Sequence, residues 1–270
     1  MMNKKYRFLS LFLILMSVGC SHSAVQNDLD SRPSVLNEVV EEVILAKQKS
    51  EVPIVIFDLD DTLFLSATRK DRILKEFADQ DKIKKKYPKF SKMIFRLPHK
   101  GGAYTVAQTL KGAGIDDDVF IKLATDFWVK RFFTNEYVTT DLPVPGGVPF
   151  VNELLKKGAF IVYLTGRDEV RMKTGTRVSL LMHHYPLGEN TLLILKPNQK
   201  IEDAEFKEKT FETLKSKGRV IAGFENEPLN INLMKKAFPL AKMIFLDTLR
   251  SDRPDKPEEG IVWIKNYKGE

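Results

Sequence analysis

The hydrophobic positions of this chain fall into short runs that alternate with longer amphipathic segments. Runs of four to six mostly apolar residues have the length of buried strands. They occupy residues 54–57, 159–164, 191–195, 220–224, 243–246 and 261–264. Between them, apolar residues recur at helical spacing, most clearly over residues 34–48. This alternation predicts an α/β protein with a doubly wound, mainly parallel, Rossmann-like sheet.

The pattern changes after Leu65. Residues 67–86 and 116–133 are rich in charge and carry apolar residues on one face, which predicts helices. A stretch with proline and glycine at 143–149 marks the return to the α/β pattern. We therefore predict an inserted helical cap, residues 66–142, within a core of residues 34–65 and 143–270.

The N-terminal segment differs from the rest of the chain. Lys4, Lys5 and Arg7 precede the apolar run 8–16, which is too short to span a bilayer and has the form of a secretory signal. Cys20 follows and is the only cysteine, so no disulfide can form within the chain. We expect a signal peptide over residues 1–19 and a polar tether over residues 20–33.

Net charge argues against some classes of partner. The three basic residues of the predicted signal have no acidic counterparts there, so its removal lowers the formal net charge from +7 to +4. That balance does not favour nucleic acid or an anionic membrane surface as a main partner. No pattern in the sequence indicates an oligomeric state.

The first predicted strand runs directly into a cluster of carboxylates, Asp58, Asp60 and Asp61. Crowded carboxylates repel one another and lose hydration, so a fold retains them where a cation or a reacting group neutralises them. Asp58 and Asp60 point the same way from an extended chain. One can therefore attack a substrate while the other handles a proton, with Thr62 as a support.

Polar side chains also follow two later strands. Thr165 and Gly166 come directly after the strand at 159–164 and can both donate a hydrogen bond to a phosphoryl oxygen. Glu225 and Asn226 follow the strand at 220–224, and their oxygens suit Mg²⁺. Ligands of open α/β sheets bind at the carboxyl ends of the strands. We therefore expect these groups to meet at one edge, with Asn230 as a possible further support.

Two of these motifs resemble signatures of the haloacid dehalogenase superfamily. The run Asp-Leu-Asp-Asp-Thr-Leu at 58–63 resembles the first signature in its phosphatase branch, which includes enzymes similar to acid phosphatases. Thr-Gly-Arg at 165–167 resembles the second. The resemblance implies that Asp58 forms an aspartyl-phosphate and that Asp60 acts as acid and base.

The third signature of that superfamily contributes a lysine, and two candidates compete for it. Asp-Ala-Glu-Phe-Lys at 203–207 resembles the form found in polynucleotide-phosphatase-like members, which favours Lys207. Lys196 then stands where those relatives often carry a basic residue. The fourth signature usually has aspartate, and here Glu225 and Asn226 replace it; glutamate is one methylene longer and asparagine carries no charge.

The resemblance implies a Mg²⁺-dependent phosphomonoester hydrolase that acts on small phosphorylated metabolites or nucleotides. The alternatives are a phosphomutase, or a lipid-anchored binding protein that has lost turnover. The residues that the resemblance implies are Asp58, Asp60, Thr165 and Lys207 for catalysis, Thr62, Gly166, Arg167 and Lys196 for phosphate binding, and Asp58, Asp60, Glu225 and Asn226 for the metal.

The predicted cap lies between the first two core strands in sequence, so it should cover Asp58 as a lid and admit small substrates. The predicted cap contains the aromatic residues Phe127, Trp128, Phe132, Phe133 and Tyr137. They either pack the interior of the lid or face a nucleobase-like leaving group. His99 is a minor candidate for substrate contact. His183 and His184 lack metal-ligand partners at suitable spacing, which favours structural roles.

The sequence around Cys20 resembles a bacterial lipoprotein box, in which the cysteine becomes lipidated and forms the mature N-terminus. The departure is Ser17, where the family prefers leucine. The resemblance implies an exported protein that is lipid-anchored to a bacterial membrane, on its periplasmic or outer face. An ordinary cleaved signal is the alternative.

Overall fold

The computed structural model describes residues 32–97 and 103–268. The predicted signal peptide, most of the tether, Cys20 and His99 lie outside the described residues. Six strands form one sheet in the order β5-β4-β1-β6-β7-β8, and every neighbouring pair is parallel. The strands are β1 (Pro53–Phe57), β4 (Phe160–Asp168), β5 (Thr191–Lys196), β6 (Arg219–Glu225), β7 (Lys242–Leu246) and β8 (Val262–Ile264).

The strand order confirms the predicted doubly wound α/β fold. From β1 the chain adds β4 and β5 on one side, then crosses to β6, β7 and β8 on the other. Alternate residues of β1 enter different hydrophobic clusters: Val55 and Phe57 pack into one, and Ile54 and Ile56 into the other. The sheet is therefore covered on both faces, as a parallel sheet must be.

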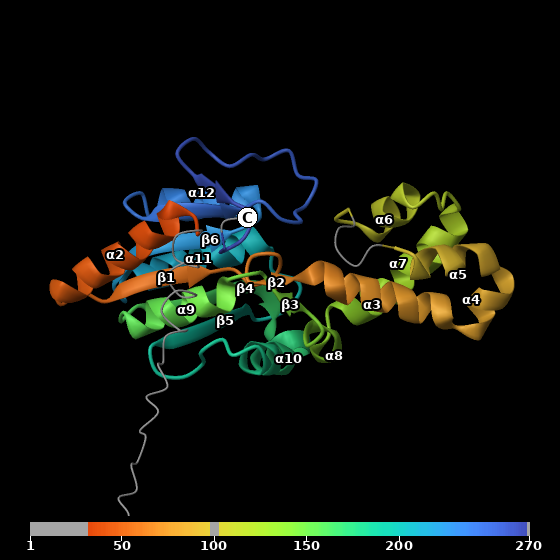
Figure 1. Ribbon diagram of the computed structural model, residues 1–270, viewed down its shortest axis with the longest axis horizontal. Helices are drawn as coiled ribbons and strands as arrows, with labels where there is room; N and C mark the ends of the chain where they lie inside the picture. The colour runs from red at the N-terminus through yellow and green to blue at the C-terminus, as the bar shows by residue number, and fades with distance from the viewer. Residues whose placement is uncertain (1–31, 98–102, 269–270) are drawn as a thin grey trace, which may run out of the picture.

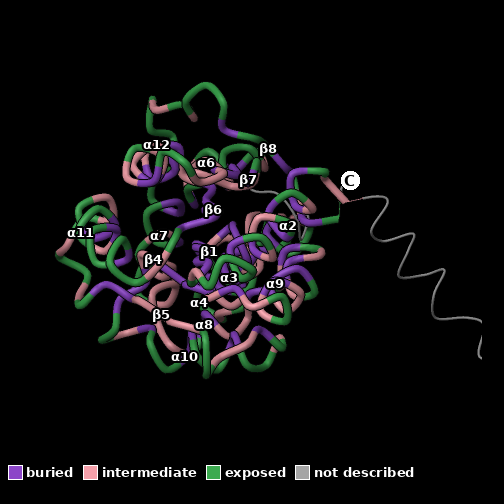
Figure 2. The backbone as a smooth tube through the Cα atoms, turned by 90° about the vertical axis from the view of Figure 1, so that its left-hand side faces the viewer, coloured by how far each residue is buried: buried purple, intermediate pink, exposed green. Residues whose placement is uncertain are grey.

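Helices supply the two covering layers. The cluster around Phe57 receives apolar side chains from α2 (Ser34–Gln48), α9 (Gly147–Lys156) and α10 (Glu169–Met182). The opposite cluster receives them from α11 (Asp203–Lys215) and α12 (Pro228–Ala237). Figure 2 shows the resulting buried strands at the centre, with most exposed backbone at the periphery. No helix among the described residues has the length and apolar character needed to cross a membrane.

A separate group of helices extends from one end of the sheet, where Figure 1 shows them projecting away from the core. They build their own hydrophobic cluster, in which Phe77, Ile94, Leu110 and Phe120 are buried. We call this group the cap. Its helices are α3 (Ser66–Asp79), α4 (Asp81–Lys86), α5 (Pro88–Phe95), α6 (Val106–Gly112) and α7 (Asp118–Phe132), and α8 (Asn135–Val138), which follows them, packs beside α10 of the core.

The chain enters and leaves the cap through two adjacent short strands. β2 (Phe64–Leu65) pairs antiparallel with β3 (Leu142–Pro143). The helix predicted over 67–86 is in fact two helices, because Gln80 adopts an extended conformation between them. The helix predicted from Asp116 begins at Asp118, where the Asp117 side chain accepts a hydrogen bond from the Phe120 amide at 2.8 Å.

Candidate active site

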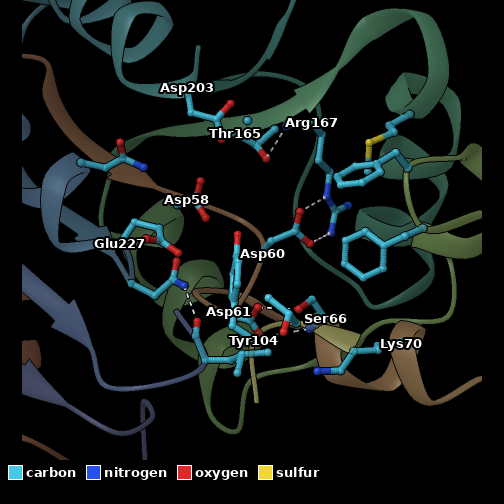
Figure 3. Close-up of a pocket in the computed structure, with 18 of the residues that line it drawn as sticks. Asp58, Asp60, Asp61, Ser66, Lys70, Tyr104, Thr165, Arg167, Asp203 and Glu227 are labelled. Atoms are coloured by element: carbon cyan, nitrogen blue, oxygen red, sulfur yellow. Dashed lines mark hydrogen bonds and ion pairs between the residues drawn. The ribbon is translucent and has the colours of Figure 1, made fainter. Parts of the chain in front are cut away.

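The predicted motifs converge at the carboxyl ends of β1, β4 and β6. The chain order reverses between β4 and β6 on either side of β1, which is where doubly wound sheets bind ligands. A cavity of about 430 Å³ opens there between the core and the cap. Asp58, Asp60, Thr165, Lys207 and Glu225 all line it, and Figure 3 shows several of these side chains around the open space.

Lys207 connects two buried carboxylates at the floor of this cavity. Its Nζ lies 2.8 Å from Oδ1 of Asp58 and 2.5 Å from Oε2 of Glu225. Burial and the neighbouring charge of Glu225 raise the pKa of Asp58 well above its usual value, against the opposing effect of Lys207. Burial alone would lower the pKa of Lys207, but the two carboxylates outweigh it and hold the ammonium charged.

The structure therefore separates the two lysines that the sequence left open. Lys196 donates to the Ile201 carbonyl at 3.0 Å and pairs with Asp203, and it is not among the residues that line the cavity. Thr62 is also not among them: it is buried and donates to Oδ1 of Asn226 at 3.2 Å. Neither side chain is therefore among the groups that face the cavity, and the phosphate-binding roles expected for them stay predictions.

Thr165, Gly166 and Arg167 stand together beside Asp58 as predicted. Thr165 is buried and its Oγ accepts a hydrogen bond from the Arg167 amide at 3.3 Å. A Cβ atom on residue 166 would come within 2.4 Å of the Asp203 carboxylate, so any larger residue would require the Asp203 side chain to shift. This part of the cavity wall depends on a close approach between β4 and α11.

Asp60 belongs to a cluster of four charged groups. Its carboxylate accepts from Arg167 at 2.7 and 3.1 Å and from Arg69 at 2.6 Å. Both arginines also pair with Asp141, and only Asp60 of the four is appreciably exposed, with 32% of its side chain accessible. Burial alone would raise the pKa of Asp60, but Arg167 and Arg69 hold it well below its usual range.

Asp61 turns away from Asp58 and is held near the start of the cap. Its φ of 58° is left-handed, and its carboxylate accepts hydrogen bonds from the amide and the hydroxyl of Ser66. Burial raises its pKa to about 7, against the opposing effect of those hydrogen bonds. The three carboxylates of the first motif are therefore in three different electrostatic environments.

The predicted metal ligands do not form one set in this structure. The described residues contain no group of three or more His, Cys, Asp or Glu side chains that could hold a metal ion. The reason is that other partners already neutralise them: Arg69 and Arg167 bind Asp60, while Glu225 accepts from Lys207 and from the amides of residues 226 and 227.

Two other oxygens at the cavity do suit a hard cation. Oδ2 of Asp58 is not bonded to any group in the described part of the chain. Asn230 lines the same cavity, and its Oδ1 is buried and lacks a hydrogen-bond partner among the described residues. A buried carboxylate with a raised pKa and an unpaired amide oxygen fit Mg²⁺, which takes oxygen ligands.

The cap forms the wall opposite Asp58. Trp128, Phe132 and Phe133 line the cavity and contact one another, with ring centroids 4.5 to 5.7 Å apart. Trp128 keeps a buried Nε1 without a hydrogen-bond partner among the described residues. Phe127 and Tyr137 instead pack inside the cap, against Phe77 and beside Glu76. The aromatic residues of the prediction thus divide between the interior of the cap and the wall of the cavity.

The histidines between β4 and β5 lie apart from this site. His183 packs against the Phe64 ring at 5.8 Å, and its Nε2 is buried without a partner among the described residues. His184 has a φ of 63° in the turn after α10. Neither residue is among those that line the cavity, and the structural roles expected for them stay predictions.

No family model matches this sequence, and a comparison with curated proteins gave no match. Solved structures with a similar fold include a HAD-superfamily hydrolase, subfamily IA, variant 1, from Geobacter sulfurreducens. It is 11% identical over 80% of this chain and 93% of that one, with a TM-score of 0.46.

Two further structures are a hydrolase of the haloacid dehalogenase-like family from Streptococcus pneumoniae and CbbY from Rhodobacter sphaeroides in complex with phosphate. The first is 13% identical over 73% of this chain and 85% of that one, with a TM-score of 0.43. The second is 11% identical over 81% and 95%, with a TM-score of 0.44. Because such distant likeness does not assign a function, the function is inferred from the geometry of the site.

Proposed function

We propose that this protein is a phosphoric monoester hydrolase that works through an aspartyl-phosphate on Asp58. The observation that carries the proposal is the contact between Lys207 and Asp58, 149 residues apart in sequence and both buried at the floor of the cavity. The ammonium lowers the repulsion between a carboxylate nucleophile and an anionic phosphate. Thr165 lines the same cavity and supplies a hydroxyl for the phosphoryl oxygens.

The reaction proceeds in two displacements. A carboxylate oxygen of Asp58 attacks phosphorus and the bond from phosphorus to the ester oxygen breaks. Asp60, which the two arginines keep ionised, takes the proton that the bound ester monoanion carries and passes it to the departing ester oxygen. Asp60, ionised again, then takes a proton from water as the water oxygen attacks the aspartyl-phosphate. Inorganic phosphate leaves with that proton, and Asp58 and Asp60 are both carboxylates again, so protons and bonds balance over the cycle.

We further propose that Asp58 and Asn230 hold Mg²⁺ during this reaction. Support comes from their two oxygens at the cavity that lack protein partners within the described residues. The ion would neutralise charge on the phosphate. Carboxylates of Asp60 and Glu225 stay with their cationic partners in this proposal, which departs from the set that the sequence implies.

The cap favours small substrates in this proposal. Its aromatic wall and the nucleophile stand on opposite sides of a cavity of about 430 Å³, within the range of sites for small molecules. Trp128 offers both an aromatic face and an unpaired N–H, which suits a planar leaving group with a hydrogen-bond acceptor. Small phosphorylated metabolites, nucleotides among them, meet this description.

One observation favours a second candidate, a binding protein without turnover. Both oxygens of Glu225 are engaged, by Lys207 and by backbone amides, so the fourth motif contributes no free metal ligand. A site without a bound metal would still hold an anionic ligand through Lys207. A phosphomutase would use the same Asp58 and Asp60, but no contact in the described residues favours it over hydrolysis.

We also propose that the protein works outside the cytoplasm, tethered by lipid on Cys20. The proposal is supported by the basic residues, the apolar run and the single cysteine at the N-terminus. It places the substrate among phosphoesters that reach the periplasmic or outer face of a bacterial membrane.

The test of catalysis is release of inorganic phosphate from a panel of small phosphomonoesters, with and without Mg²⁺, by wild-type protein and Asp58→Asn. Turnover that requires Mg²⁺ and disappears in Asp58→Asn supports the hydrolase. Tight phosphate binding by both proteins, without turnover by the wild type, would instead establish the binding protein.

A further inference from the structure

The four-charge cluster is built at the junction between the core and the cap. Asp60 follows β1 and Arg167 lies on β4, so both belong to the core. Arg69 lies in the first turn of α3, just after the chain enters the cap, and Asp141 immediately precedes β3, where the chain returns. The cluster therefore joins the core to both segments that carry the cap.

Asp141 fixes the direction of both guanidinium groups. Its Oδ1 accepts from Nε of Arg69 at 2.9 Å, and its Oδ2 accepts from Nη2 of both arginines. The Nη2 groups that bond Asp141 also donate to Oδ1 of Asp60, at 2.6 Å from Arg69 and 2.7 Å from Arg167. A guanidinium is planar, so holding one edge of it sets where the remaining N–H groups point.

Arg69 is tied to the cavity wall as well. Its Nη1 donates to the Phe132 carbonyl at 3.1 Å, and its guanidinium carbon lies 4.2 Å from the centre of the Phe132 ring. Phe132 lines the cavity, whereas neither Arg69 nor Asp141 is among the lining residues. Arg69 therefore links Asp60 to the cap side of the cavity wall through Phe132, although Arg69 itself does not line the cavity.

We propose that Arg69 and Asp141 are positioning residues for Asp60. Together they hold its carboxylate toward the cavity from the two segments that join the cap to the core, where it can carry a proton to the leaving group. This inference rests on the proposed hydrolase function, because it assigns Asp60 the transfer of that proton. Arg167, which lines the cavity, also donates to Asp60, from the core.

The test uses two esters that differ in their need for a proton donor. Benzyl phosphate leaves as a strongly basic alkoxide and needs protonation, whereas 4-nitrophenyl phosphate leaves as a weakly basic phenolate and needs it much less. Asp141→Asn and Arg69→Lys should lower kcat/KM for benzyl phosphate about tenfold or more relative to 4-nitrophenyl phosphate. The Asp60→Asn variant, which lacks the acid itself, gives the largest loss of kcat/KM for benzyl phosphate relative to 4-nitrophenyl phosphate that any variant should show.

Two controls separate positioning from loss of structure. Phe120→Leu loosens the cap core away from the cluster and should change both esters by the same factor. Arg72→Lys alters an exposed ion pair with Glu76 on the same helix and should change neither. Thermal unfolding of each variant shows whether it is folded. Equal losses on the two esters in Asp141→Asn and Arg69→Lys would overturn the proposal.

If the wild type hydrolyses neither ester, the proposed function fails. Crystal structures then decide whether Arg69 and Asp141 position the Asp60 carboxylate. Crystal structures of Asp141→Asn and Arg69→Lys should then show the Asp60 carboxylate displaced from its wild-type position. An unmoved Asp60 in both variants would overturn the proposal independently of catalysis.

Discussion

Replacing Lys207 with methionine gives the sharpest test of the site. The substitution keeps the length of the side chain and removes its charge, leaving Asp58 and Glu225 facing each other in the interior. At 2.8 Å and an effective dielectric of about 20, the gross attraction between the ammonium and Asp58 is about 6 kcal/mol. Desolvation of the buried charges offsets part of it, so removing one partner should lower the free energy of unfolding by about 3–5 kcal/mol.

Lys196→Met is the matched comparison. The Lys196 pair with Asp203 is half-exposed on the aspartate side, with 47% of that side chain accessible. Exposed pairs contribute about 0–1 kcal/mol. Urea unfolding at pH 7 should therefore separate the two variants by about 2 kcal/mol or more. Phosphate release should be abolished in Lys207→Met, because an unpaired Asp58 takes up a proton and ceases to be a nucleophile.

A double variant tests the cause. If electrostatic repulsion between the carboxylates destabilises Lys207→Met, then adding Glu225→Gln should recover part of the lost free energy. Stability within about 1 kcal/mol of the wild type for Lys207→Met alone would refute the reasoning. So would losses that simply add in the double variant, because additivity means that the two groups do not interact.

Four further outcomes are expected. Asn230→Ala should weaken Mg²⁺ binding measured by calorimetry while leaving the melting temperature nearly unchanged in a chelator, and unaltered Mg²⁺ affinity would remove Asn230 from the metal site. Small phosphomonoesters should be hydrolysed with much higher kcat/KM than a folded phosphoprotein. The Trp128→Ala variant should lose more activity on a nucleoside monophosphate than on glycerol phosphate. Equal losses on the two esters would mean that the indole does not contact the leaving group. Cys20→Ser should move the protein from the membrane to the soluble fraction or leave its signal uncleaved, and membrane retention with normal cleavage would contradict lipidation.

The sheet and the floor of the site follow from patterns that a sequence displays directly. Each buried strand is a short apolar run, and the groups that line the cavity come just after those runs, as Asp58, Thr165 and Glu225 do. Parallel strands bring their carboxyl ends to one edge whatever the distance along the chain. Lys207 could be favoured over Lys196 only by resemblance, because no local pattern indicates which lysine reaches back to β1.

The charged junction could not be predicted in the same way. Arg69 lies in a charge-rich amphipathic helix, where an arginine is ordinarily at the surface. Asp141 stands before Leu-Pro, which indicates a turn and no particular chemistry. Their burial depends on Arg167 and Asp60 approaching from the core, so it is a property of the assembled fold. The sequence offers only a charge-rich stretch after Leu65 and one aspartate before Leu-Pro, and neither indicates burial.

The paired strands β2 and β3 also bear on how this protein folds. β1 and β4 are neighbours in the sheet, yet the whole cap lies between them in the chain, and contacts over such separations form slowly because a long loop must close. A cap that collapses first around Phe77 and Phe120 brings Leu65 beside Leu142, which shortens the loop that remains to be closed. Early folding of the inserted helices would then speed formation of the sheet. A mutation in the cap core should therefore slow refolding of the sheet, although the mutated residue lies far from any strand.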